Sequence, residues 1–364
     1  MPMTPNAPAT SSGPQLQPEE IAALWPTLTE RVELPMKQQA FAGLGESQNL
    51  TLERVFCVAE AQVLLSLSWE TPAAAEATPC LGMPQGAIKK VQLKANGTSG
   101  IIAASGRVLE ARQQVVYSNP EHAILANANS KPEKIAAKTA VKWEWVVQVP
   151  IAEDLKQLEG IVLAQTEETA LEIEVEWAKE GEIVSAGTME KVTGTVAWAI
   201  TAFTVGTMEN RGQKVLVLPD LKLLHGLIER SSNYESEGEQ ESPLTRSAGD
   251  LLRYYFNVFK KGLVSEFDVK ELLYVYLQFG GNQKPEQWGS PKLLLERNAR
   301  DYRKRIEVGG VHYGILDRTL DDPERDAIRP MALSELKLIV GIPAKPEENA
   351  RIYSTQETLY PAGL

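Results

Sequence analysis

Alternating hydrophobic and polar residues mark much of this chain as β-strand. In the stretch TAVKWEWVVQV, Trp143, Trp145 and Val147 lie on one side of an extended chain, whereas Lys142 and Glu144 lie on the other. The later stretch LEIEVEWA alternates in the same way. A period of two residues is typical of a strand with one buried and one solvated face. Both stretches are therefore predicted strands of a half-buried sheet.

Runs of β-branched and aromatic residues between Gly, Pro and Asn predict further strands along the chain. In the first half, the predicted strands cover 54–70, 86–95, 107–118, 139–149, 171–178 and 191–205. In the second half, they follow a polar loop at 232–247 and cover 250–264, 270–281, 310–318, 334–343 and 350–360. Many short strands and few helices favour an all-β sandwich or jelly roll in each half.

Three apolar stripes at helical spacing predict three helices. The stripe near the N-terminus consists of Ile21, Leu24, Trp25, Leu28 and Val32. The second follows the strand that Pro150 closes, and it consists of Ile151, Leu155, Leu158 and Val162. The third follows an N-cap at Ser290 and a first-turn Pro291, and it consists of Leu295, Ala299, Tyr302 and Ile306.

Length and composition suggest two domains behind a short N-terminal arm. The chain has 364 residues, more than one typical domain of roughly 150. Residues 1–18 are rich in Pro, Ala, Ser and Thr, so we expect a disordered or extended arm. We predict an arm with a short amphipathic helix at 1–34, a first strand-rich domain at 35–208, and a second at 209–364. Each domain carries one helix, so the architecture repeats.

Charge and hydropathy narrow the classes of partner. The net charge of −11 repels phosphate backbones, so we expect no direct contact with nucleic acid. No apolar run reaches the roughly 20 residues that span a bilayer. The N-terminal residues lack the pattern of a secretion signal, so we expect synthesis in a host cytoplasm. The two cysteines, Cys57 and Cys80, cannot form a disulfide framework and are expected to be reduced.

The residue patterns that usually carry catalysis are missing. The three histidines, His122, His225 and His312, are not close in sequence to a nucleophile motif or to clustered zinc ligands. The acidic stretch from Asp321 to Asp326 lacks the Gly and terminal Glu of a calcium loop, so we expect at most an adventitious ion there. No phosphate-binding or dinucleotide motif occurs. We therefore predict no enzyme activity, no cofactor and no structural metal.

A family resemblance accounts for these features. The run WEWVVQVPIAEDLKQLEGIVLAQTEETALEIEVEWA, 143–178, resembles the major capsid proteins of tectivirus-like, membrane-containing tailless phages. Its matching features are an aromatic strand ending in Val149, Pro150 and Ile151, then a short polar helix and an alternating strand. The blocks SPKLLLERNARDYRKRI, GVHYGILDR and ENARIYSTQETLYPAGL are similar to the family's second helix and C-terminal strands.

This resemblance implies two eight-stranded jelly rolls in one chain, each with a flanking α-helix. It implies a homotrimer that forms a pseudo-hexagonal capsomer and tiles an icosahedral shell over an internal membrane. The flanking helices would pack their stripes where neighbouring rolls meet. The expected partners are neighbouring capsomers, penton proteins and minor capsid proteins, and the expected location is the virion. The N-terminal arm would lie on the inner side of the shell, against protein or against lipid.

Two alternatives remain open at this point. A double jelly roll could instead be a glycan-active enzyme or a lectin, which needs convergent carboxylates and exposed tryptophans. Glu172, Glu174 and Glu176 share one strand face and do not converge across a cleft. A vertex or spike protein of the same virion would have one roll and a stalk, and two strand-rich halves count against it.

Overall fold

The computed structural model describes most of the chain. The described residues are 20, 23–53, 56–95, 98–117, 133–153, 155, 158–164, 171–210, 213–244, 250–279, 283–319 and 336–361. His122 and Ile21, as well as the acidic stretch from Asp321 to Asp326, lie outside them. Among the described residues, no helix is both long enough and apolar enough to cross a membrane.

The first half of the chain forms a sandwich of two sheets, which we call the first roll. In one sheet, β12 pairs with β4 and β4 pairs with β8. The short strands β1 and β2 both pair with the other side of β12, and β9 pairs with the first residues of β4. Its strands are β1 (Arg31–Glu33), β2 (Lys37–Ala40), β12 (Glu190–Phe203), β4 (Cys57–Glu70), β8 (Ala140–Pro150) and β9 (Val162–Leu163). The facing sheet contains, in order, β3 (Ser47–Thr51), β10 (Leu171–Trp177), β6 (Ile88–Ala95) and β7 (Thr98–Ala104).

The second half repeats this arrangement as the second roll. One of its sheets contains, in order, β15 (Leu223–Asn233), β25 (Arg351–Pro361) and β17 (Asp250–Lys261), with β18 (Ser265–Phe267) and β23 (Gly314–Asp317) both pairing with β17. The other contains β16 (Gly238–Pro243), β24 (Leu336–Ile342), β19 (Val275–Phe279) and β20 (Gln283–Trp288). Strand β16 lies inside the predicted polar loop at 232–247, so that prediction is wrong.

The two rolls have the same strand order when each strand is matched to its counterpart along the chain. The sheet β12, β4, β8 corresponds to β25, β17, β23, and the sheet β3, β10, β6, β7 corresponds to β16, β24, β19, β20. Each set of eight antiparallel strands in two facing sheets is a jelly roll. The rolls are also joined, because β7 pairs with β15 in parallel at Leu227 with Ile102 and at Ile228 with Ala103.

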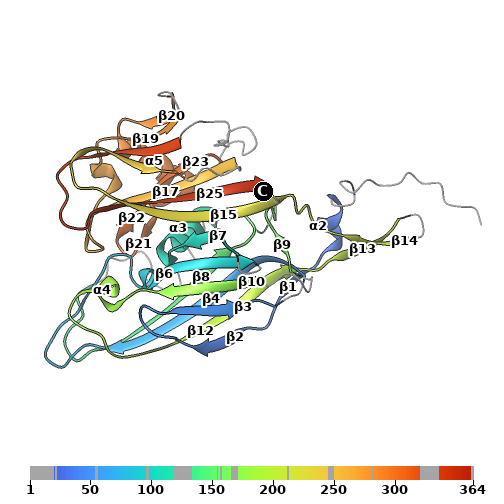
Figure 1. Cartoon of the computed structure of the whole chain (residues 1–364), viewed down its shortest axis with the longest axis horizontal. Coiled ribbons are helices and arrows are strands. Elements are labelled where there is room, and N and C mark those ends of the chain that lie inside the picture. Colours follow the sequence, from blue (N-terminus) through green and yellow to red (C-terminus); the bar gives the residue numbers. More distant parts are fainter. Residues whose placement is uncertain are drawn as a thin grey trace, which may run out of the picture.

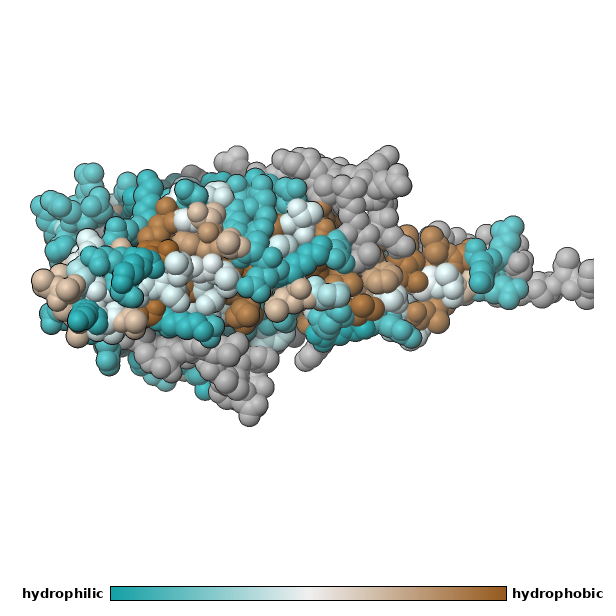
Figure 2. All heavy atoms as spheres, turned by 90° about the horizontal axis from the view of Figure 1, so that it is seen from below, coloured by the Kyte–Doolittle hydropathy of each residue, from teal (hydrophilic) through white to brown (hydrophobic). Residues whose placement is uncertain are grey.

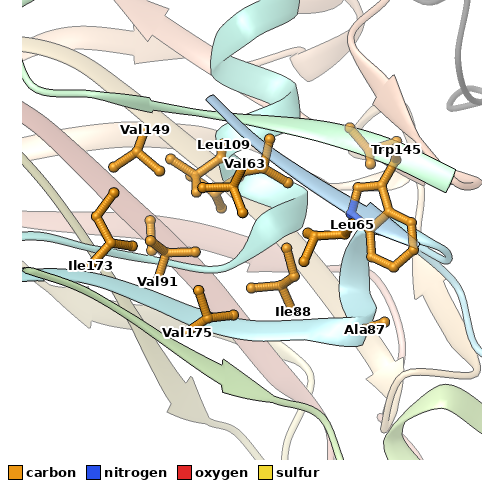
Figure 3. Close-up of a cluster of buried hydrophobic side chains, with 14 of the residues drawn as sticks. Val63, Leu65, Ala87, Ile88, Val91, Leu109, Trp145, Val149, Ile173 and Val175 are labelled. Carbon is orange, nitrogen blue, oxygen red and sulfur yellow. The ribbon is translucent and has the colours of Figure 1, made fainter. Parts of the chain in front are cut away.

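The core of the first roll lies between its two sheets. The alternating pattern of β8 and β10 is confirmed, with Trp145, Val147, Ile173 and Val175 buried. Figure 3 shows Trp145, Ile173 and Val175 in one cluster with Val63 and Leu65 of β4 and Val91 of β6. Full burial of an aliphatic side chain stabilises a fold by roughly 1.5–3 kcal/mol before entropy is subtracted.

Short elements complete the fold around the two rolls. A hairpin of β13 (Gly206–Asn210) and β14 (Gln213–Val217) projects from the molecule beside the short helix α2 (Trp25–Leu28), as Figure 1 shows. The small pieces within the body are β5 (Thr78–Pro79), β11 (Val184–Ala186), β21 (Glu307–Val308), β22 (Val311–His312), α4 (Glu180–Ile183), η1 (Gln85–Ala87) and η3 (Val269–Glu271).

The helix of the first roll is not where the sequence pattern placed it. Residues 107–118, predicted to be a strand, contain the helix α3 (Gly106–Val116). The predicted helix at 151–162 is wrong, because its described residues form bends, a turn and the strand β9. Leu158 and Gly160 have φ angles of 60° and 82°, which lie outside the right-handed helical region. Helix α3 follows β7 just as the second helix follows β20.

The helix of the second roll is confirmed. It is α5 (Pro291–Tyr302), with Ser290 at the N-cap position and Pro291 in its first turn. It ends at Arg303, whose φ of 59° is left-handed. Ile306 therefore lies beyond the helix, although its side chain is buried.

Candidate functional site: a buried ionic junction between the rolls

Helix α3 lies between the two rolls, as Figure 1 shows. It packs against β6 and β8 of the first roll and against β21 in the second half of the chain. Its buried residues include Val108, Leu109 and Val115, but also the polar Arg112 and Gln114. A helix covered on several sides needs partners for its polar groups, because an unpaired buried charge is costly.

The partner of Arg112 is Glu357, a carboxylate of the second roll. Arg112 Nε donates to Glu357 Oε1 at 2.6 Å, and the two side chains are 3% and 0% exposed. A second Arg112 nitrogen donates to the carbonyl oxygen of Glu153, which follows β8. The helix of the first roll is therefore tied to the C-terminal strand β25 through a fully desolvated ion pair.

Arg253 on β17 extends this pair into a network. Its Nη1 donates to Glu153 Oε1 at 2.7 Å and lies 3.3 Å from Glu357 Oε2. Its Nε donates to Asp317 Oδ2 at 3.2 Å, and the same oxygen accepts from the hydroxyl of Tyr302 at 2.6 Å. The network thus links the loop after β8 with β17, β23, β25 and α5.

His225 on β15 closes the network beside Glu357. Its Nδ1 donates to the carbonyl oxygen of Pro150 at 2.9 Å, and its Nε2 lies 3.0 Å from Glu357 Oε1. Gly160 packs directly on His225, because a Cβ at this glycine would come within 2.5 Å of the His225 amide nitrogen. The loop after Pro150 therefore approaches the second roll closely only because residue 160 is glycine.

The electrostatics of the junction follow from burial and pairing. Burial alone would raise the pKa of Glu357, but the guanidinium charges of Arg112 and Arg253 outweigh it and hold the pKa well below 4.5. Burial opposes the charge of Arg253, yet Glu357 and Asp317 raise its pKa well above its usual value. Burial, followed by the nearby charge of Glu357, raises the pKa of Tyr255, whose hydroxyl donates to Glu357 at 2.8 Å. Glu357 therefore stays a carboxylate, Arg253 stays a cation and Tyr255 keeps its hydroxyl proton.

This arrangement supports structure rather than turnover. Both ring nitrogens of His225 face oxygen atoms of Pro150 and Glu357, so neither is directed at a nucleophile. His225 and Glu357 have no exposed surface, so a substrate cannot reach them. Within the described ranges, no group of three His, Cys, Asp or Glu side chains is arranged to hold a metal ion. The junction can fix the relative position of two rolls.

The residues of the second and third predicted stripes lie in three separate hydrophobic clusters. Ile151, Tyr302 and Ile306 belong to the cluster around α3, Leu295 to the core of the second roll, and Leu158 to the cluster around Trp25. Ile151 and Leu158 are buried, whereas Leu155 and Val162 are partly buried, and all belong to a loop and strand instead of a helix. On α5, Leu295 and Tyr302 are buried and Ala299 is partly buried. The stripe missed Leu294 and Asn298, which are also buried. Asn298 binds the backbone of Ile315 on β23 through both its amide nitrogen and its oxygen.

The residues of the N-terminal stripe divide between two structures. Trp25 is 2% exposed and packs against Phe203, whereas Leu24 and Leu28 are 36% and 41% exposed. Val32 lies in β1 and pairs with Ala202, so the helix prediction is wrong at this position. The apolar surface in Figure 2 includes the projecting end, where Leu24, Leu28 and Leu216 are exposed.

The glutamates of β10 and the tryptophans of the first roll bear on the alternative of a glycan-binding protein. Glu174 pairs with Lys94 at 2.8 Å and Glu176 with Lys89 at 2.9 Å, both within this chain. Trp69, Trp145 and Trp177 are at most 2% exposed. These tryptophans are core residues and cannot serve as sugar-binding platforms.

The arginine and carboxylate residues of the junction were missed by sequence reasoning. Arg112 and Glu357 are separated by 245 positions, and neither stands in a recognisable motif. The one available signal is the charged Arg253 inside the aromatic run LLRYYFNVF, where a charge implies a buried partner.

Comparisons with known proteins agree with this architecture. No protein-family model and no curated protein matches the sequence. The crystal structure of the STIV MCP, from Sulfolobus turreted icosahedral virus, gives a TM-score of 0.63 at 13% identity over 90% of this chain and 97% of that chain. The PBCV-1 virus capsid model gives 0.63 at 8% identity, covering 91% and 93%.

A bacteriophage protein gives the same result at lower similarity. The major capsid protein P2 of bacteriophage PM2 has a TM-score of 0.50 at 13% identity, covering 92% of this chain and 98% of that chain. Identities this low establish a shared fold and no more. Together with the matched strand orders of the two rolls, they show that this chain has the double jelly-roll fold.

Proposed function

We propose that this protein is the major capsid protein of an icosahedral virus with an internal membrane, and that it acts without catalysis. Three chains would form a homotrimer whose six rolls give a pseudo-hexagonal capsomer. The capsomers would tile the shell beside penton and minor capsid proteins. The protein would be made in the host cytoplasm and would reside in the virion.

One observation carries this proposal. Both rolls together match the STIV MCP over 90% of this chain and 97% of that chain, so the likeness includes the arrangement of the rolls and not one roll alone. The buried ionic junction supports the same conclusion. A shell subunit must hold its two rolls in one geometry, and a paired, desolvated network favours one arrangement over slipped ones.

The first test is the mass of the purified protein in solution. Size-exclusion chromatography with light scattering should give three times the chain mass of 40.0 kDa. A stable monomer that binds glycans would contradict the capsid proposal and favour a lectin or a glycan-active enzyme. Cryo-electron microscopy of particles containing the protein should then show three chains in each capsomer.

The N-terminal segment is the proposed contact with the inner side of the shell. We propose that Leu24 and Leu28, together with residues before them, pack on protein or lipid beneath the capsomer. Crosslinking from a cysteine placed at Leu24 in assembled particles should capture a neighbouring chain or a lipid. Capture of neither would remove the segment from the assembly proposal.

A further inference from the structure

A pocket at the edge of the junction has a composition unlike the rest of the surface. It opens where β6 and β7 of the first roll meet β15 and β25 of the second, and it has a volume of about 190 Å³. One water molecule needs roughly 10–15 Å³ by the same kind of measure, so the pocket has room for a polyatomic ion.

The pocket is cationic in an acidic protein. Its basic lining residues are Lys89, Lys90, Arg107, Arg230 and Arg351, and its acidic ones are Glu176, Glu182 and Glu229. Lys89 is balanced by Glu176 at 2.9 Å and by Glu182 at 3.9 Å. Five basic and three acidic residues give the lining a formal net charge of +2, whereas the whole chain has a net charge of −11.

The N-terminus of α3 borders the pocket and is incompletely capped. Ser105 is the N-cap residue, but its buried hydroxyl makes no capping hydrogen bond to the helix and lies beside the carboxylate of Glu229. The first amides of a helix have no partner inside the helix, and their dipoles attract anions. The Ser105 amide itself donates to Glu229 Oε2 at 2.6 Å, so the chain supplies one anion there.

Arg107, in the first turn of α3, is the second independent feature. Its side chain is 6% exposed, and its guanidinium lies over the rings of Phe259 and Tyr353 at 5.4 and 5.2 Å. Its Nε and Nη1 atoms have no acceptor in the described part of the chain. Glu229 and Tyr353 support the charge of Arg107, but desolvated cationic donors without acceptors are costly, so a bound anion that accepts from Nε and Nη1 would be favoured.

We propose that this pocket binds a small tetrahedral oxyanion of the phosphate or sulfate class, held by Ser105, Arg107 and the start of α3. A tetrahedral oxyanion offers several acceptor oxygens at once, which suits donors that converge from a hydroxyl, a guanidinium and a helix terminus. The exposed side chains of Arg230 and Arg351 at the rim would add electrostatic attraction for the anion. Burial raises the pKa of Glu229, although the nearby charge of Arg107 opposes this shift.

The test is calorimetric titration of the full chain with inorganic phosphate, in chloride buffer of constant pH and ionic strength. The double variant Arg230→Ser with Arg351→Ser removes two exposed rim charges and should weaken binding roughly tenfold. The matched control, Lys292→Ser with Lys345→Ser, removes the same charge from exposed positions that do not line the pocket, and it should bind like the wild type.

A third variant tests the inner part of the pocket. Ser105→Ala removes the hydroxyl at the start of α3 and should weaken phosphate binding severalfold, while the melting temperature in chloride stays near the wild-type value because no capping bond is lost. Acetate, a planar carboxylate, should bind more weakly than phosphate or sulfate. Absence of phosphate binding in the wild type would overturn the proposal, as would equal losses in the rim variant and the Lys292/Lys345 control.

Discussion

Strands β4 and β17 occupy the same position in the two rolls, yet their environments differ. Along most of β4, buried residues such as Val63 and Leu65 alternate with partly exposed ones. Along β17, nine successive residues are buried. Tyr254, Phe256 and Val258 face the core of the second roll, whereas Tyr255 and Phe259 face the core that surrounds α3. The outer face of β17 is therefore covered by other parts of the chain, whereas the outer face of β4 is partly exposed to solvent.

The two helices show the same difference. Helix α5 lies at the outside of the second roll and keeps an exposed face that includes Leu293 at 62% exposure. Helix α3 is wedged between the rolls, and even its arginines are buried. The chain thus uses one architecture twice, but the contact between the copies makes one helix and one sheet into interior elements.

The largest expected effect comes from breaking the ionic junction. Arg253→Met removes the cation that pairs with Glu153 and Asp317 and one of the two arginines beside Glu357, and removing one member of a buried ion pair costs roughly 3–5 kcal/mol. Chemical denaturation should show this loss in the free energy of unfolding. Lys191→Met, which removes an exposed pair with Glu70, is the control and should leave the unfolding midpoint unchanged. Equal midpoints for both variants would refute the junction's structural role.

The comparison of β4 with β17 can be tested on their outward faces. Phe259→Ala on β17 should lower the free energy of unfolding by about 3–5 kcal/mol, because Phe259 is fully buried against the α3 side. Leu64→Ala on β4 should cost less than about 1 kcal/mol, because that face is partly solvated. Similar costs at both positions would mean that the second roll is not covered as described.

Sequence patterns predicted elements with one buried face and failed for interior ones. Helix α5 was found because its apolar stripe is flanked by polar residues and preceded by Ser290 and Pro291. Helix α3 was taken for a strand, because a helix buried on several sides has no clear stripe. The segment after Pro150 has helical spacing, but Gly160 adopts a left-handed conformation where the loop meets His225. The spacing of apolar residues does not report that contact.

The junction itself lay beyond sequence reasoning for a related reason. Arg112, Arg253 and Glu357 come from a helix and two strands that meet only after both rolls have folded. A charged residue in an apolar run indicates that a partner exists, but not which of 48 acidic residues it is. The jelly-roll fold could be predicted from local patterns, because the period of two residues and the turns between strands recur in both halves of the sequence.

The depressed pKa of Glu357 predicts an acid-sensitive junction. A carboxylate with a folded-state pKa below its unfolded value contributes stability above about pH 4.5, and this is lost as the pH falls through the folded pKa. Wild-type protein should therefore lose stability below pH 4.5 more steeply than Glu357→Gln. Burial raises the pKa values of Glu60 and of the partly buried Glu110, which act in the opposite sense, so the difference between the two proteins is the relevant quantity. Parallel pH profiles would contradict the assignment.

The smallest expected effect lies at His312, on the second-roll side of the α3 contact. Its Nδ1 is 2.6 Å from Glu266 and its Nε2 is 3.6 Å from Glu307, with Asp268 nearby. The hydrogen bond to Glu266 raises the pKa of His312 above 6.5, although burial opposes it. The stabilisation should therefore be complete below pH 6.5 and should disappear as the pH rises through the folded pKa.

The variant His312→Gln measures this contribution. It should lower the free energy of unfolding by about 1 kcal/mol below pH 6.5, and the difference from wild type should shrink as the pH rises. Lys304 is also partly buried, but burial lowers its pKa. Its effect on the pH dependence of stability is therefore opposite to that of His312. A difference that stays constant as the pH changes would show that His312 acts through packing and not through its charged hydrogen bond to Glu266.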